Sequence, residues 1–388
     1  MTFGAVGPDG NGFQPQGSGV ESIKTGHSSR RRFLRCTGHA GLAVAGAGAW
    51  HCAQAVGGNA GYIPRPTDQE EWEAFKQRYV TPEGRVVDTG NHRISHSEGQ
   101  GWGLLFAVTY DDRPCFDRIL DWTSHRLRRP HDSLHAWRFD PFAPDPVGDH
   151  NNATDGDLFI AAALVRSARS WHRPDHMRTA VMMAKDILDL LVRPWRQRTI
   201  LLPGADGFTT VTGVVINPSY YAFPALDDVA QLVPSERWDA LRRDGLSLIV
   251  EGRFGRWMLP PDWLVISRED GSLAPAPGWP ARYSYDAVRV PLYLTWSRLF
   301  SPALQQAFTT FWSSNSTPFM PAWADLQTNA LSPYPAPAGM VAVAQVAGAT
   351  AATTDLPAGF PSVASASDYY SAALILLSRI AWRASRSS

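Results

Sequence analysis

The sequence NNATDGDLFIAAALVRSARSW, residues 151–171, joins a polar segment to a strongly apolar helical pattern. Apolar residues fill every position from Leu158 to Val165, and we predict a helix over 157–171. Two Asn and two Asp stand directly before the apolar run. Thr154 or Asp155 could cap this helix, but a cap accounts for only one residue of the polar group.

The same helical spacing of apolar residues recurs along most of the chain. It predicts further helices over 70–79, 103–110, 116–127, 177–192, 219–232, 235–250, 285–300, 302–312, 340–346 and 369–382. Strand signals are few: 208–211 and 214–216 could form a short ribbon, and 263–267 is another small strand. No low-complexity linker divides residues 56–388, so the sequence predicts a single all-α domain of paired helices. Helical hairpins closed into a ring place their loops at one end, and loops are where sites are built.

Residues 1–55 have the order of an export signal. Arg30 and Arg31 form a twin-arginine pattern, a weakly apolar run follows, and a small-residue cleavage site ends at Ala55. We therefore expect export to the periplasm or the medium by the twin-arginine route, with cleavage after Ala55. The apolar run is too short to span a bilayer as a mature helix, so no stable membrane anchor is expected. A disordered basic tail is the alternative interpretation.

Composition narrows the range of partners. The chain of 388 residues has 36 basic and 36 acidic side chains, which gives no electrostatic reason to expect nucleic acid or an anionic membrane as partner. Only Cys115 follows the predicted signal, so no intrachain disulfide is expected in the mature chain. The 15 Trp residues are unusual. Filling the core is the default use of aromatic residues, but a surplus of indoles also suits a carbohydrate ligand, whose C–H faces stack on rings.

The segment Ser97-Glu98-Gly99-Gln100-Gly101-Trp102-Gly103 places one carboxylate among three glycines. We predict a loop that enters the helix from Gly103, with Glu98 at or near the first turn. Each glycine weakens a helix start by about 1 kcal/mol relative to alanine, so three of them indicate that another group approaches the backbone closely. A sugar ring lying across Trp102 is one interpretation. The other is a carboxylate favoured by the helix dipole, beside glycines that only make a turn.

A third carboxylate stands beside an arginine. Asp286 and Arg289 are three residues apart in a predicted helix and can form an ion pair. An arginine neighbour lowers the pKa of a carboxyl group and keeps it ionised, which suits a base acting on water. An ordinary helix salt bridge is the alternative.

Metal and cofactor signatures are missing from the sequence. Asp155 and Asp157 could chelate Ca²⁺, but the spaced ligand series of a calcium loop is absent. The eleven His residues form no zinc signature, and there is no phosphate loop, G-x-S-x-G motif or dinucleotide fingerprint. We therefore expect no metal and no cofactor.

Together these segments resemble glycoside hydrolase family 8 from about Trp72 to Leu377. The Ala-Thr-Asp-Gly-Asp helix is similar to the signature of that family, with Ser167 where Ala is usual, and Trp102 stands where Tyr or Phe is commoner. The other matching segments occur in the order of the family: Val87-Asp88-Thr89, Ser97 to Gly101, Trp137-Arg138, Ala143-Pro144-Asp145-Pro146, Asn151 to Asp157, Asn217-Pro218-Ser219-Tyr220, Leu259-Pro260, Asp286-Ala287-Val288-Arg289, Pro291-Leu292-Tyr293 and Asp368-Tyr369-Tyr370-Ser371.

The resemblance implies an (α/α)6 barrel of paired helices, with long loops forming a substrate groove at one end, and endo-acting hydrolysis of β-1,4-glucan with inversion. It implies that Glu98 is the general acid, Asp286 the general base, and Asp155 the residue that holds the sugar at the cleavage point. The substrate-binding positions that we expect are Trp102, Trp137, Tyr220, Arg289 and Tyr370.

The expected chemistry uses two carboxyl groups, one to protonate the leaving oxygen and one to activate water, roughly 6.5–9.5 Å apart. Glu98 then needs a raised pKa to stay protonated near neutral pH. The resemblance is greatest to family members that accompany bacterial cellulose synthase, which implies a β-1,4-glucan chain and the synthase complex as partners. Hydrolysis of xylan or chitosan is one alternative. A non-catalytic glucan-binding component is another, although the presence of all three carboxylates argues against it.

Overall fold

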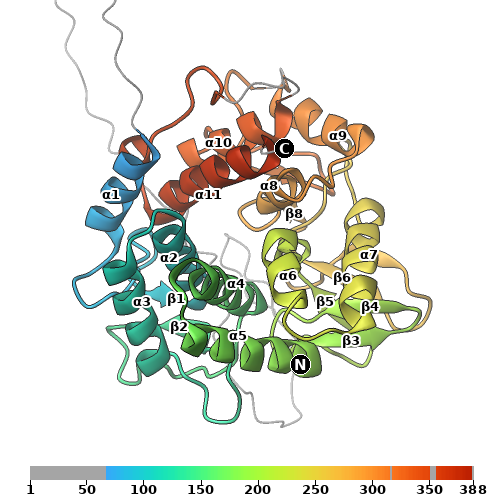
Figure 1. Cartoon of the computed structure of the whole chain (residues 1–388). Coiled ribbons are helices and arrows are strands. Elements are labelled where there is room, and N and C mark those ends of the chain that lie inside the picture. Colours follow the sequence, from blue (N-terminus) through green and yellow to red (C-terminus); the bar gives the residue numbers. More distant parts are fainter. Residues whose placement is uncertain (1–66, 315–316, 350–354, 387–388) are drawn as a thin grey trace, which may run out of the picture.

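A double ring of α-helices forms the frame of the computed structural model, which describes residues 67–314, 317–349 and 355–386 (Figure 1). Around the centre lie α2 (Ser97–Thr109), α4 (Thr154–Trp171), α6 (Phe223–Ala230), α8 (Arg289–Trp296) and α11 (Tyr369–Arg386). Outside them lie α1 (Asp68–Tyr79), α3 (Arg113–Arg126), α5 (Pro174–Asp186), α7 (Glu236–Glu251) and α9 (Pro302–Trp312), and α10 (Ala338–Gly348) packs against α11 and α8. The predicted all-α (α/α)6 barrel is confirmed. The predicted export signal lies outside the described residues.

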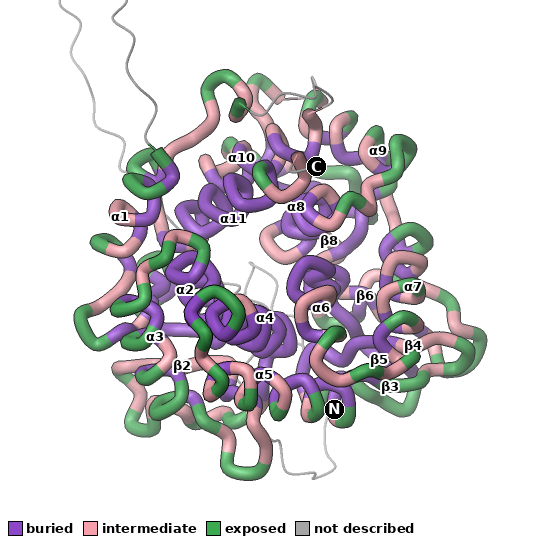
Figure 2. The backbone as a smooth tube through the Cα atoms, viewed as in Figure 1, coloured by how far each residue is buried: buried purple, intermediate pink, exposed green. Residues whose placement is uncertain are grey.

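The apolar stretch from Leu158 to Val165 lies in α4 of the inner ring. Every residue from Leu158 to Val165 is at most 1 % exposed, because neighbouring helices cover this helix on all sides. Figure 2 shows the same contrast for the whole ring, with buried inner helices and outer helices that alternate between buried and exposed turns. Within the described ranges, no helix combines the length and the apolar character needed to cross a membrane.

Short antiparallel strands occupy the loops between the helices. A three-stranded sheet contains β5 (Gly213–Ile216), β6 (Leu264–Ser267) and β7 (Leu273–Pro275). Two-stranded pairs join β1 (Ser95–His96) to β2 (Arg138–Phe139), β3 (Val192–Trp195) to β4 (Arg198–Leu201), and β8 (Arg282–Tyr283) to β9 (Ala324–Asp325). The predicted ribbon between 208–211 and 214–216 is reduced to one bridge, Thr209–Val214, and β5 pairs along its whole length with β6.

The predicted glycine-rich loop before α2 is wrong, because the helix already begins at Ser97 and contains all three glycines. A Cβ atom on Gly101 would lie 2.9 Å from Cβ of Phe159 in α4. A Cβ atom on Gly99 would lie 2.7 Å from the hydroxyl of Tyr369 in α11. The glycines therefore admit neighbouring helices rather than a sugar.

Three predicted helices are too long. The helix predicted over 219–232 is only α6, Phe223–Ala230, after a separate 3-10 turn over Pro218–Tyr220. The helix predicted over 177–192 ends at Asp186, continues as a π-helical turn over Ile187–Leu191, and gives way to β3. Pro194 accounts for this end, since it cannot continue a helix and it drives the residue before it into an extended conformation. The helix predicted from 285 begins only at Arg289, after a turn that contains Asp286.

Candidate active site

The N-terminal ends of the inner helices border one cavity of about 1030 Å³. Each of five inner helices contributes a lining residue within three residues of its start: His96 (α2), Ala153 (α4), Tyr220 (α6), Arg289 (α8) and Tyr370 (α11). Loops supply most of the remaining wall, as expected for a ring of helical hairpins, and Met340 of α10 and Leu374 of α11 also line it.

Arg289 gathers the three predicted carboxylates around one buried guanidinium group. Its Nη1 donates to Oε1 of Glu98. Its Nη2 lies 3.0 Å from Oδ1 of Asp286 and 3.5 Å from Oδ2 of Asp155. The arginine and the carboxylates of Glu98 and Asp155 are almost fully buried, whereas the side chain of Asp286 is 14 % exposed. The structure therefore brings together residues that are 191 positions apart in the sequence.

The N-terminal ends of three inner helices position Glu98, Asp155 and Arg289. Glu98 and Asp155 are the second residues of α2 and α4, where the helix dipole favours a negative charge, and Arg289 is the first residue of α8. Gly156 allows the first two helix starts to touch. A Cβ atom on it would lie 2.3 Å from Oγ of Ser97 and 2.6 Å from the backbone nitrogen of Glu98. The glycine between the two Asp residues is thus required by the contact between α4 and α2.

The guanidinium group of Arg289 has further support on its other sides. Ser219 accepts a hydrogen bond of 2.7 Å from Nη2 and donates one of 2.7 Å to Oδ1 of Asn217. The guanidinium carbon also lies 5.7 Å from the ring centre of Trp102 and 5.9 Å from that of Tyr220, within the range of cation–π attraction. Because the group is held from several directions, the carboxylates that contact it are held as well.

Trp102 is not placed to bind a substrate, which corrects the prediction of a sugar ring across its indole. The side chain is 0 % exposed and does not line the cavity. It stacks instead on Tyr369, with ring centres 6.4 Å apart and planes at 24°, and meets Phe159 edge to face. The indole therefore lies in the core, with the guanidinium group of Arg289 over its ring.

The other predicted aromatic residues, Trp137, Tyr220 and Tyr370, all line the cavity. Trp137 is held in place at both its edge and its face. Its Nε1 donates to Oδ2 of Asp149 at 2.8 Å, and its ring stacks on His96 with planes at 15° and ring centres 6.3 Å apart. An indole fixed in this way offers a rigid surface for a ligand.

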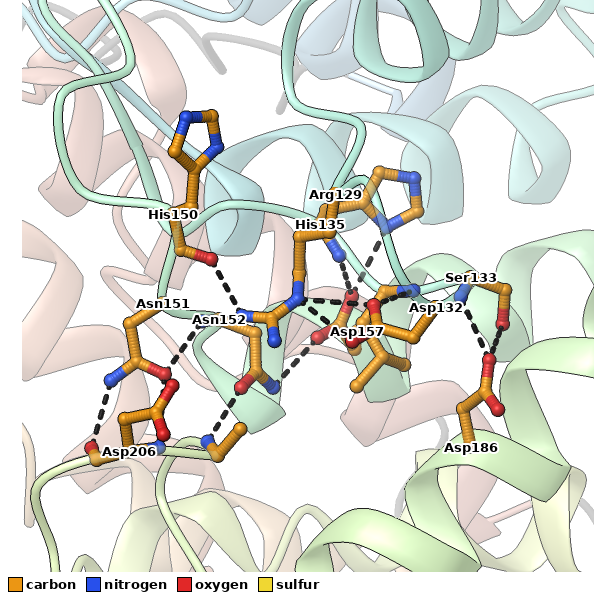
Figure 3. Close-up of polar contacts among 12 residues, drawn as sticks. Arg129, Asp132, Ser133, His135, His150, Asn151, Asn152, Asp157, Asp186 and Asp206 are labelled. Atoms are coloured by element: carbon orange, nitrogen blue, oxygen red, sulfur yellow. Dashed lines mark hydrogen bonds and ion pairs between the residues drawn. The ribbon is translucent and has the colours of Figure 1, made fainter.

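Asp157 is a structural carboxylate that holds the segments around the start of α4 (Figure 3). It accepts hydrogen bonds from the backbone N–H of His135 at 2.9 Å, from the ring of His135 at 3.1 Å and from Asn152 at 3.0 Å. Burial raises the pKa of Asp157, and the bonds from His135 and Asn152 oppose that rise. The predicted cap is wrong, since α4 has no side-chain cap and the hydroxyl of Thr154 donates to the carbonyl of Leu202.

The two Asn residues before α4 join this network to a second loop (Figure 3). Asn152 accepts from the N–H of Ala205 at 2.8 Å, and Asn151 donates to the carbonyl of Asp206 at 2.9 Å. The polar residues of the motif therefore divide into Asp155, which faces Arg289, and others that hold the surrounding loops.

Sequence reasoning missed a group of cavity residues on and beside the β5–β6–β7 sheet. Trp263 stacks on Phe208 with ring centres 5.9 Å apart and on Trp279 with ring centres 5.2 Å apart. Asp262 precedes this tryptophan and also lines the cavity. The surplus of Trp in the composition was the only signal for the aromatic residues, and nothing near Asp262 in the sequence marks it.

A cluster of carboxyl groups beside a cavity with aromatic walls is typical of the active site of a glycoside hydrolase. The family model described as glycosyl hydrolases family 8 matches residues 40–384, and the chain belongs to this family. The chain is 45 % identical over 312 residues to the "Probable endoglucanase" of Novacetimonas hansenii, covering 80 % of this chain and 90 % of that protein. It is 38 % identical to the endoglucanase of Cellulomonas uda, covering 72 % of this chain and 78 % of that protein.

The fold is similar to that of solved structures of the same kind. The structure of endo-β-1,4-glucanase CMCax from Acetobacter xylinum matches with a TM-score of 0.77 and 44 % identity, covering 81 % of this chain and 97 % of that one.

Proposed function

We propose that this protein is an endo-β-1,4-glucanase, a cellulase that cleaves internal bonds of cellulose with inversion of configuration. The observation that carries the proposal is the cluster of Glu98, Asp155 and Asp286 around Arg289, beside the large cavity that Asp286 and Arg289 line. Membership of family 8 and the endoglucanase relatives support the same substrate class. Hydrolysis of xylan or chitosan by the same carboxylates is the alternative that an assay has to separate.

In the proposed mechanism, Glu98 protonates the glycosidic oxygen as the bond to the anomeric carbon breaks. Asp286, the most exposed of the three carboxylates, removes a proton from the water that attacks the opposite face of the sugar. Asp155 holds the sugar at the cleavage point. Arg289 orients all three, and the remaining binding surface is supplied by Trp137, Tyr220 and Tyr370.

Stereochemistry and substrate range test this proposal together. The reducing ends that form first from a soluble β-1,4-glucan are expected to be α-anomers in a time-resolved proton NMR experiment, because water attacks opposite the leaving group. Initial β-anomers would contradict inversion. Reducing-sugar assays on carboxymethylcellulose, xylan and chitosan with one preparation should show the highest rate on the first. No activity on any of them would favour a glucan-binding role.

We further infer that residues 1–55 direct export and that 56–388 form the single catalytic domain. The twin-arginine pattern and the cleavage site support this division, although the family match begins at residue 40, inside the proposed signal. Replacing Arg30 and Arg31 by Lys should leave the protein in the cytoplasm while the parent reaches the periplasm or medium, as fractionation and immunoblotting would show. Equal export of both proteins would exclude the twin-arginine route.

A role beside cellulose synthase is the biological setting that we propose. An enzyme that cleaves internal bonds can trim a glucan chain as it leaves a synthase, and the sequence resemblance points to family members that work there. A gene for cellulose synthase next to the gene for this protein would support this setting.

A further inference from the structure

Asp262 holds the turn that carries the proposed general base. Its Oδ1 accepts hydrogen bonds from the backbone N–H groups of Ser284 at 3.0 Å, Asp286 at 3.2 Å and Ala287 at 2.8 Å. Its own N–H donates to the carbonyl of Arg282 at 2.7 Å. One carboxylate oxygen therefore accepts three backbone N–H bonds from the single turn that contains Asp286, and Asp262 itself lines the cavity.

The same turn determines where Arg289 begins its helix. The N–H of Val288 donates to the carbonyl of Ser284 at 3.0 Å, and the N–H of Arg289 donates to the carbonyl of Asp286 at 3.1 Å. Asp262 thus fixes the backbone of the proposed base directly and that of the central arginine through one further hydrogen bond. A shift of this turn would move both groups relative to Glu98.

Charge as well as geometry connects the two Asp residues. Removal from bulk water and, next, the nearby carboxylate of Asp286 raise the pKa of Asp262 well above its ordinary value, while its backbone N–H bonds oppose the rise. Asp286 therefore has a cation, Arg289, at 3.0 Å and a second acidic group beside it. The other charged or titratable groups around the pair are Glu98 from α2, Asp155 from α4, and Arg282 and Tyr283 from β8.

We propose that Asp262 is a positioning residue that holds Asp286 where it can take a proton from the attacking water. The proposal rests on the proposed role of Asp286. In that step the water oxygen bonds to the anomeric carbon, its proton goes to Asp286, and the leaving oxygen takes the bonding electrons and a proton from Glu98. The raised pKa of Asp262 favours its neutral form, so Asp262 holds the turn without placing a second negative charge beside Asp286.

Two variants separate the three hydrogen bonds from the acidic group itself. Asp262→Asn keeps an oxygen that can accept the three N–H bonds, and it is neutral like the protonated acid. Its kcat and the bell-shaped dependence of its kcat/KM on pH should therefore stay close to those of the parent. Asp262→Ala also removes the acceptor, and its kcat should fall about 100-fold because a base displaced by about 1 Å is far less effective.

The matched control is Asp244→Asn on the outer helix α7. Asp244 also accepts a backbone hydrogen bond, from Thr199 at 2.7 Å, and should leave the pH profile unchanged. An Asp262→Ala variant with the kcat of the parent, or an Asp262→Asn variant as slow as Asp262→Ala, would overturn the proposal, because the three N–H bonds would then not be what holds the base. A parent enzyme with no activity on glucans would instead overturn the proposed function. Melting temperatures show whether each variant is folded.

Discussion

Glu98→Gln is expected to lower kcat on a natural β-1,4-glucan by about 10²–10⁴-fold, the usual contribution of a general acid. Glutamine keeps an oxygen that can accept the hydrogen bond from Arg289, so the fold and the position of the side chain should be retained. It has no proton to give to the leaving oxygen. Steady-state rates on carboxymethylcellulose and circular dichroism spectra measure the two parts of this prediction.

The loss in Glu98→Gln should depend on the leaving group. An aryl cellooligosaccharide whose phenol is acidic needs no protonation, so its hydrolysis should be nearly as fast as in the parent. Asp286→Asn should be slow on both substrates, because activation of water is required in either case. Glu251→Gln, on the outer helix α7 and paired with Arg198, is the control and should match the parent. Near-parental cleavage of carboxymethylcellulose by either Glu98→Gln or Asp286→Asn would refute the assignment of these residues.

Gly156→Ala is expected to be strongly destabilising, although alanine normally stabilises a helix interior relative to glycine. The new methyl group would lie 2.3 Å from Oγ of Ser97 and 2.6 Å from the backbone nitrogen of Glu98. A rotated side chain can relieve the first contact, but only a movement of the α2 backbone can relieve the second. We expect a loss of about 1–3 kcal/mol in the free energy of unfolding, as for other overpacked sites.

Activity should fall further than stability alone explains in Gly156→Ala, because the backbone that must move carries Glu98. A displacement of about 1 Å can cost about 100-fold in rate. Denaturant unfolding and kcat at a temperature where the variant is folded test both parts. Gly148→Ala is the control, since its nearest contact would be an ordinary 3.6 Å. If the two variants had equal stability, the close contact of α4 with α2 could not be the reason for this glycine.

The sequence allowed the ring of helices and the three carboxylates to be predicted because both leave marks on it. Apolar spacing reveals a helix such as α4, and the family resemblance ties Glu98, Asp155 and Asp286 to one site. The sequence does not show in which direction a buried aromatic side chain points. Trp102 is only four residues after Glu98, the proposed acid, yet its side chain is buried in the core against the guanidinium group of Arg289.

The reason for the glycines of α2 and the proposed role of Asp262 could not be predicted from the sequence, for a related reason. Both depend on what lies across a contact, and those partners come from distant parts of the chain. A glycine looks the same whether it admits a sugar or the Cβ atom of Phe159. An isolated Asp gives no sign that it will accept three backbone N–H bonds from residues more than twenty positions further on.

The first turns of three inner helices meet at Arg289, whereas the aromatic wall of the cavity comes from other segments. The cavity wall can therefore be altered separately from the charged cluster. The proposed acid and base and their partners belong to the first turns of α2, α4 and α8 or to the turn just before α8, whereas the stacked rings of Phe208, Trp263 and Trp279 lie in loops that flank β5, β6 and β7. Substitutions in those loops would alter which polysaccharide lies in the cavity without rebuilding the proposed acid and base. In laboratory evolution, these loops are therefore the region to randomise for a new substrate, and the three helix starts are the region to leave untouched.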